Sequence, residues 1–230
     1  AIRIIYDAFS DDVITPGVTT CRDVMNFMEQ QVNNLGLTFW FPATIDLQRH
    51  DGMHGEDTVI ERGDLLHCDF GINYMNLCTD TQRLCYVLKE DETEIPEELL
   101  KAFARNNRFQ DIVRETMKSG KTGNDVFTEA VAKGKEEGLR PFLYTHPLGF
   151  HGHAAGPTIG LWSDQNPIPV KGERKVYNHT SYALELSILE YLPMYGRDTF
   201  IFTEESVVFD DDRMEFLTAG RDRMSVVGRK

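Results

Sequence analysis

The sequence contains no long apolar run and few cysteines, and both absences limit what the protein can be. No stretch of about 18 apolar residues occurs, so we expect no membrane-spanning helix. Its four cysteines (Cys21, Cys68, Cys78 and Cys85) form no Cys-x-x-Cys pair, and three lie in or beside predicted strands, where small apolar thiols fit well. We therefore expect free thiols and not a disulfide framework.

Basic residues are scarce relative to acidic ones. The chain has 24 lysines and arginines against 37 aspartates and glutamates, which gives a net charge of −13. Nucleic acids and anionic membranes need a basic face on the protein, so neither is expected as a partner. The 230 residues, 41% of them hydrophobic, are enough to form a core in one large domain.

An initiator methionine and a signal-peptide pattern are also missing from the start of the chain. This abrupt beginning leads us to expect a separate N-terminal domain upstream of residues 1–230. The sequence does not determine the compartment. A cytoplasmic location is favoured, and an export signal would have to lie in that upstream region.

Apolar periodicity predicts three amphipathic helices, at 21–35, 97–117 and 123–137. A short motif recurs at one constant offset: Thr20, Asp23, Val24, Gly36 and Leu37 match Thr122, Asp125, Val126, Gly138 and Leu139. Each matched polar or glycine residue has the same capping or terminating position around a helix. We therefore predict two similar halves, roughly 1–118 and 119–230, each with a helix followed by strands.

Two carboxylates, Asp69 and Asp80, stand on what should be adjoining strands. Residues 65–70 and 84–88 have strand composition, and turn-forming residues lie between them. A hairpin would bring the carboxylates together, and two such charges in a partly buried site stay ionised only around a cation. His67 shares the face of Asp69 and is a further candidate ligand at this point. A divalent metal is the simplest such cation.

Acids also interrupt two apolar strands of the second half. Glu185 is the lone acid among apolar neighbours in 181–189, and Glu204 and Glu205 lie together in 200–209. Strand alternation sends Glu204 and Glu205 to opposite faces, one toward the interior and one toward solvent. An unpaired buried carboxylate costs several kcal/mol. Four acids in four separate apolar strands therefore indicate one shared site.

Three histidines, His146, His151 and His153, fall in a stretch too rich in glycine and proline for a helix. A ligand set of imidazole and carboxylates is typical of manganese, iron, cobalt or zinc in a catalytic site. A structural zinc site is less expected, because structural zinc prefers thiolate ligands. Four carboxylates also neutralise two dications. We therefore expect a dinuclear centre in which a metal-activated water attacks a carbonyl group.

The order Asp69, Asp80, His146, Glu185 and Glu204, with Asp80 eleven residues after Asp69 and His146 in a His-x-x-Gly context, resembles a known signature. It is similar to the five-ligand set of the pita-bread metallopeptidase superfamily, which includes methionine aminopeptidase, prolidase and aminopeptidase P. The resemblance covers nearly the whole chain. It implies an α+β pita-bread fold, a single catalytic domain over 1–230 with two pseudo-symmetric halves, each with helices on a curved, mainly antiparallel sheet.

The resemblance also implies roles for these residues. Asp69 would chelate one metal ion, His146 and Glu185 would bind the other, and Asp80 and Glu204 would bridge both. Glu185 would in addition take a proton from the nucleophilic water. His67 is then not needed as a ligand. The metals would lie where the two halves meet.

Two histidines are implied to bind substrate. His153 would hold the substrate or its tetrahedral intermediate. A further histidine is expected some seventeen residues before Asp69. His54 and His50 lie on either side of that position, and His54 is chosen for the role. One departure from the family pattern is Phe202, which stands where relatives often have an arginine or glutamine that orients a bridging carboxylate.

The implied activity is that of a metal-dependent exopeptidase that hydrolyses a peptide bond near an N-terminus, with Xaa-Pro bonds as the favoured target. The chain is most like the C-terminal catalytic domain of an Xaa-Pro peptidase, because proline peptidases carry an additional N-terminal domain. Dipeptidase and aminopeptidase activity both stay open. Two divalent ions are expected, manganese before cobalt, zinc or iron, together with a peptide substrate, and a homodimer is left open.

Three alternatives remain. One is a methionine-aminopeptidase-like activity, and another is an inactive peptide-binding module of the same fold, against which the presence of all five ligands argues. The third is a non-haem iron oxygenase that uses His67 and Asp69 with a distant histidine. The scaffold of such oxygenases is an all-β barrel, and the three predicted helices argue against it.

Overall fold

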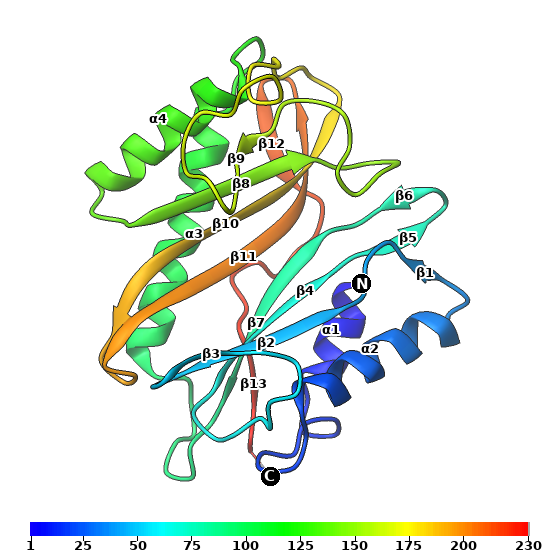
Figure 1. Cartoon of the computed structure of the whole chain (residues 1–230), viewed down its shortest axis with the longest axis vertical. Helices are drawn as coiled ribbons and strands as arrows, with labels where there is room; N and C mark the ends of the chain where they lie inside the picture. Colours follow the sequence, from blue (N-terminus) through cyan, green and yellow to red (C-terminus); the bar gives the residue numbers. More distant parts are fainter. Residues whose placement is uncertain (230) are drawn as a thin grey trace. The chain divides into compact units, whose positions relative to one another are not determined.

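The structure is a computed structural model that describes residues 1–229 (Figure 1). The chain divides into two compact units. The first contains Ala1–Leu100, Tyr191–Thr199 and the residues from Arg223 on, and the second contains Lys101–Glu190 and Phe200–Asp222. The first unit ends at Leu100, where the predicted first half extends to 118, and a short segment and the chain end return to the first unit from the predicted second half 119–230.

The first unit contains two helices and eight strands. The helices are α1 (Ile2–Ala8) and α2 (Cys21–Asn34). The strands are β1 (Thr38–Phe39), β2 (Thr44–Arg49), β3 (Gly52–His54), β4 (Leu65–Phe70), β5 (Ile72–Tyr74), β6 (Leu77–Cys78), β7 (Thr81–Val87) and β13 (Ser225–Val227). Strands β3, β2, β4 and β7 are antiparallel neighbours in that order, β13 runs parallel to β7, and β1, β5 and β6 form a small separate sheet.

Alternation along these strands separates the core from the polar face. Leu66 and Cys68 of β4 belong to the hydrophobic cluster that also holds Met28 and Val32 of α2. His67 and Asp69 leave the same strand on its other face. The helices therefore cover one face of the strands (Figure 1), and the acids are displayed on the opposite one.

The second unit is also built from helices and antiparallel strands. It contains most of α3 (Glu97–Thr116) and all of α4 (Gly123–Glu136). Its strands are β8 (Pro141–Pro147), β9 (Ile159–Gly160), β10 (Thr180–Leu192), β11 (Arg197–Asp210) and β12 (Arg213–Phe216), with the last residues of β10 and the first of β11 in the first unit. The strand order is β11, β10, β8, β9, and β12 pairs with β11.

The predicted sequence repeat corresponds to a structural one. Thr20 and Thr122 each form a reciprocal capping box with the aspartate three residues later, at the start of α2 and α4. Gly36 and Gly138 each follow the end of their helix with a left-handed φ, +67° and +74°. The three predicted helices are confirmed to within one residue at each end, and the fold is α+β.

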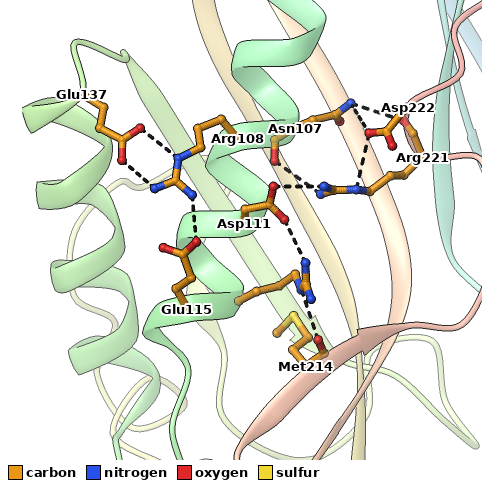
Figure 2. A network of polar contacts seen from close by, with 9 residues as sticks. Asn107, Arg108, Asp111, Glu115, Glu137, Met214, Arg221 and Asp222 are labelled. Atoms are coloured by element: carbon orange, nitrogen blue, oxygen red, sulfur yellow. Dashed lines mark hydrogen bonds and ion pairs between the residues drawn. The ribbon is translucent and has the colours of Figure 1, made fainter.

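A polar network ties the C-terminal part of the second unit to α3 (Figure 2). Asp111 pairs with Arg114 at 2.9 Å and with Arg221 at 3.0 Å. Both guanidinium groups lie over the ring of Phe216, 4.9 Å and 4.6 Å from its centroid. The sequence analysis predicts no structure for residues 210–222. In the structure, their charged and apolar side chains pack against α3.

Two predictions about the whole chain can be compared with the described residues. Over residues 1–229, no helix is both long and apolar enough to cross a membrane. All four cysteines are free and buried, which confirms the prediction of thiols. Residues 38–49 form the two strands β1 and β2 and not one continuous strand, because Pro42 lies between them and has no N–H to donate.

Candidate functional site

The first unit brings Asp69 and Asp80 together on the polar face of its strands. Asp69 lies in β4 opposite Gln82 of β7, and Asp80 lies two residues before Gln82 and thus on the same face. The two carboxyl groups are within hydrogen-bonding reach of each other. Asp80 is only 4% exposed. Burial raises the pKa of Asp69 to about 6, and a bound cation would lower the free-energy cost of holding both acids ionised.

His67 lies beside this pair, and both of its ring nitrogens are occupied. Nδ1 donates to Asp46 Oδ2 at 2.9 Å, and Nε2 donates to Gln82 Oε1 at 3.0 Å. Burial by itself would favour the neutral ring, but the Asp46 carboxylate raises the pKa of His67 to about 9. A doubly protonated imidazole has no lone pair to offer a metal ion.

The second unit brings His146, Glu185 and Glu204 together. His146 in β8 pairs with Ala183 of β10, which places Glu185, two residues on, on the same face, and Glu204 lies on the neighbouring β11. His146 Nε2 is 4.0 Å from Glu185 Oε2 and 3.9 Å from Glu204 Oε1. His146 and Glu204 are buried, and the Glu185 side chain is 23% exposed.

The ring of His146 is in the state that a metal ligand requires. Its Nδ1 donates to the carbonyl oxygen of Pro147 at 3.2 Å, which leaves the lone pair on Nε2 facing the carboxylates. Burial, together with neighbouring His153, lowers the pKa of His146 to about 4, so the ring is neutral at pH 7. Separations of 3.9 and 4.0 Å are too long for hydrogen bonds, and they leave space for a metal ion between the imidazole and the carboxylates.

A cavity of about 860 Å³ adjoins His146 within the second unit. His153 lines it, and the two imidazole rings meet edge to face with 4.4 Å between centroids. Tyr144 lies against both histidines, with centroid distances of 5.1 and 6.2 Å. Burial and the Lys171 ammonium lower the pKa of His153, so this exposed ring is also neutral at pH 7 and can donate one N–H to a ligand in the cavity.

The structure does not bring His54 together with the acid pair. His54 in β3 pairs with Leu47 of β2, whose side chain points into the hydrophobic cluster on the face opposite Asp69. Its Nε2 instead lies 2.7 Å from Oδ1 of Asp51. His50 is exposed in the turn between β2 and β3. A substrate role for His54 stays a prediction that this register does not favour.

The expectation that one member of the Glu204–Glu205 pair faces solvent is wrong. Both residues are 1% exposed. Glu205 Oε2 accepts a hydrogen bond from Thr218 Oγ1 at 3.2 Å, so the segment after β12 covers the face of β11 that alternation predicted to be open. The sequence of β11 by itself holds no signal for that cover.

Asp46 is a polar-face residue that the sequence analysis missed. It is a lone acid between apolar residues in β2, the same pattern that singled out Glu185. Gln82, which His67 links to Asp46, could not be singled out in the same way, because a neutral amide in a strand is common on any protein surface.

Comparison with known proteins identifies the family. Residues 1–208 match the model of metallopeptidase family M24. No curated protein sequence matches the chain. The solved structure of an X-Pro aminopeptidase from Thermotoga maritima superposes with a TM-score of 0.75 at 23% identity, over 98% of this chain and 60% of that one.

Two further solved structures have the same fold. A prolidase from Pyrococcus furiosus has a TM-score of 0.70 at 22% identity, over 95% of this chain and 60% of that one. A methionine aminopeptidase from Thermotoga maritima has a TM-score of 0.68 at 17% identity, over 95% and 92%. The chain therefore spans about 60% of the length of the two proline-specific proteins. With its α+β pita-bread fold, the chain belongs to metallopeptidase family M24.

Proposed function

We propose that this member of a metal-dependent peptidase family is an exopeptidase that hydrolyses Xaa-Pro bonds near the N-terminus of its substrate. The observation that carries the proposal is the neutral ring of His146, whose Nε2 faces two carboxylates across gaps of 3.9 and 4.0 Å. A neutral imidazole that donates through Nδ1 offers no positive charge to these two acids, of which Glu204 is buried and Glu185 is 23% exposed, so the arrangement calls for a cation. The Xaa-Pro target is supported by the titles of the similar structures, an X-Pro aminopeptidase and a prolidase.

Five residues are proposed to hold two divalent ions: Asp69, Asp80, His146, Glu185 and Glu204. Four carboxylates and one imidazole form an oxygen-rich set that suits manganese first and also admits cobalt, iron or zinc. The raised pKa of Asp69 fits this role, because a buried acid pair that lacks a metal tends to retain a proton. When bound, the ions would supply Lewis-acid polarisation and a water of lowered pKa.

Glu185 and His153 are proposed as the residues that act on the substrate. Glu185 is the more exposed of the two carboxylates beside His146, so it is the one that can exchange a proton with water and pass it to the departing amine. His153 lines the cavity with a neutral ring, from which an N–H can donate to the oxyanion that develops on the scissile carbonyl. Donation of this N–H requires no change in the charge of His153.

The test is a comparison of three peptides with metal-loaded protein. Metal-free full-length protein is loaded with manganese, cobalt or zinc, and hydrolysis of an Xaa-Pro dipeptide, an Xaa-Pro tripeptide and a Met-Ala peptide is measured. We expect manganese-dependent cleavage of an Xaa-Pro peptide. Cleavage of Met-Ala alone would replace the proposal with a methionine-aminopeptidase activity, and no cleavage at all would leave a peptide-binding module.

The ligand assignment has a separate control. Asp80→Ala should remove bound metal from both sites, since this residue is proposed to bridge them. Asp57→Ala serves as the matched variant, because Asp57 is an exposed acid of the same unit that pairs only with the surface residue Arg22. Equal loss of metal in both variants would contradict the assignment.

A further inference from the structure

The hairpin that carries Asp69 and Asp80 is interrupted immediately before Asp80. Strands β4 and β7 pair on one side of the interruption, and β5 and β6 continue the same register on the other side. Gly71 and residues 79–80 lie between these pairs of strands and belong to neither pair. The shared register places Gly71 opposite Asp80. The irregular part of the hairpin therefore contains a proposed metal ligand.

At this interruption, the backbone of Thr79 departs from the pairing of an antiparallel ladder. Its N–H donates to the Ile72 carbonyl at 2.9 Å, as in a regular hydrogen-bonded pair. The Ile72 N–H, however, donates to the side-chain Oγ1 of Thr79 at 3.1 Å. The Thr79 carbonyl oxygen accepts a hydrogen bond from the indole Nε1–H of Trp40 at 2.8 Å. A hydroxyl oxygen thus takes the place of the carbonyl oxygen in the ladder, and the carbonyl is turned toward the indole.

Strand pairing explains how Trp40 reaches this position. β1 and β5 are antiparallel neighbours, and their register, continued by one residue, places Trp40 beside Gly71. A Cβ atom at Gly71 would overlap both the indole nitrogen and the Thr79 carbonyl oxygen, so glycine leaves the room that their hydrogen bond needs. The ring of Phe41 packs edge to face on the indole, with 4.4 Å between the centroids. The indole is therefore held at the interruption by its neighbours on several sides.

The carbonyl that Trp40 holds belongs to the peptide unit that leads into Asp80. Because a peptide unit is planar and rigid, the direction of its carbonyl group fixes the orientation of the N–Cα bond of Asp80. On the other side, the Thr81 hydroxyl donates to the Asp80 carbonyl oxygen at 2.7 Å. The backbone of Asp80 is thus held before and after its Cα atom, while its carboxyl group is buried within hydrogen-bonding reach of Asp69.

We propose that Trp40 is a positioning residue for the metal-binding acids of the first unit. Its indole N–H holds the Thr79–Asp80 peptide unit in the orientation that places the Asp80 carboxylate beside that of Asp69, where a metal ion can bind both. The inference rests on the proposed function, because it assumes that these two acids are metal ligands. Such support raises metal affinity, since ligands that are already oriented lose less conformational freedom on binding.

The test measures manganese affinity by titration calorimetry of metal-free full-length protein. Trp40→Phe keeps an aromatic ring but removes the indole N–H, and we expect manganese to bind roughly tenfold or more weakly. Trp162→Phe is the matched control, because Trp162 is the second of the two tryptophans and is 75% exposed. Its manganese affinity should equal that of the original protein.

Activity gives a second measurement with the same two variants. With an Xaa-Pro peptide, Trp40→Phe should show a lower kcat at limiting manganese and an unchanged KM. Excess manganese should restore most of the lost kcat, because the substitution weakens metal binding and leaves the residues that contact the peptide in place. A loss of activity from a damaged fold would not be recovered in this way.

Two variants of Thr79 test the same contact without a change to the indole, and they decide the question if Trp40→Phe does not fold. Thr79→Val removes the Oγ1 acceptor, so the Ile72 N–H competes with the indole for the Thr79 carbonyl oxygen, and manganese affinity should fall. Thr79→Ser retains a hydroxyl acceptor and should keep the affinity of the original protein.

Equal manganese affinity in Trp40→Phe and Trp162→Phe, or in Thr79→Val and Thr79→Ser, would overturn the inference. The expected losses of manganese affinity in a protein that hydrolyses none of the peptides would contradict the proposed function but support the positioning role of Trp40.

Discussion

Nδ1 of His67 lies 2.9 Å from Oδ2 of Asp46 on the polar face of the first unit. The second ring nitrogen donates to the side-chain oxygen of Gln82, so the ring holds two protons and a positive charge. His67 is 8% exposed and shares its strand face with Asp69. A buried cation therefore accompanies the acids that are proposed to bind metal, and it offsets part of their mutual repulsion.

This pair makes stability depend on pH above neutrality. The pKa of His67 is about 9 in the folded protein, against about 6.5 for an unperturbed histidine. The proton bound in the folded state thus stabilises the protein fully below about pH 6.5, and that contribution, on the order of 3 kcal/mol, is lost as pH rises to about 9. Asp69 titrates below this range.

His67→Gln should therefore flatten the fall in unfolding free energy between pH 6.5 and 9 that the original protein shows. The measurement is urea unfolding of metal-free protein across that range. His151→Gln is the control, because His151 is exposed to solvent and lies outside the strands that carry the acids. Equal slopes for the original protein and His67→Gln would mean that the pair does not hold an extra proton.

Local rules were enough to predict the repeat and the strands that carry the proposed metal ligands. Thr20 and Thr122 were predicted as caps because a threonine followed three residues later by aspartate satisfies the free amides of a helix start. Asp69 was identified because a hairpin would place it beside Asp80, and Glu185 because an acid inside an apolar strand must have a partner. Both arguments use local sequence patterns, and neither needs to know which distant segments pack together.

Contacts between distant segments were beyond the reach of these rules. Glu205 is buried because Thr218, beyond the next strand, covers it, and the N–H of Gly123 holds the segment 168–176 through the carbonyl of Arg174. His54 was placed by its spacing from Asp69, but pairing with Leu47 turns its side chain to the other face. Such placements follow from strand register and tertiary packing. A shift of one residue in strand pairing moves every side chain of the strand to the other face of the sheet.

Metal binding should raise the thermal stability of the protein, because the proposed ligands are assembled only in the folded state. A ligand present at about 100 times its dissociation constant adds about 2.7 kcal/mol. Differential scanning calorimetry with and without manganese should therefore show a higher Tm for the loaded protein. His146→Ala should lose most of that increase, whereas His151→Ala should keep it. A manganese-induced shift that survives in His146→Ala would remove His146 from the ligand set.

Gly71 lies where no side chain fits. A Cβ atom at this position would overlap the indole nitrogen of Trp40 and the carbonyl oxygen of Thr79, which are themselves hydrogen-bonded at 2.8 Å. Gly71→Ala should destabilise the protein by about 1–3 kcal/mol, the usual range for overpacking. Urea unfolding can compare it with Gly55→Ala, where a Cβ meets nothing within 4 Å. Equal stability of the two variants would show that the Trp40 loop moves freely.

Glu204 and Glu205 are equally buried, but Glu204 is predicted to bind metal and Glu205 to stabilise the fold. Two measurements can separate these roles. Glu204 faces His146, so Glu204→Ala should lower the amount of metal retained per chain after dialysis. Glu205 points to the opposite face and accepts a hydrogen bond from Thr218. Glu205→Ala leaves that hydroxyl unpaired beside a new cavity, so it should cost about 1–3 kcal/mol of unfolding free energy.

In Glu205→Ala the metal content should stay that of the original protein, and in Glu204→Ala it should fall even where the protein remains folded. Elemental analysis after dialysis and urea unfolding of the same samples give both quantities. Thr218→Val is a useful companion to Glu205→Ala, because it removes the same hydrogen bond from the other side without touching either strand face. If Glu205→Ala loses metal and Glu204→Ala retains it, the ligand on β11 is Glu205, and the alternation of that strand must be shifted by one residue.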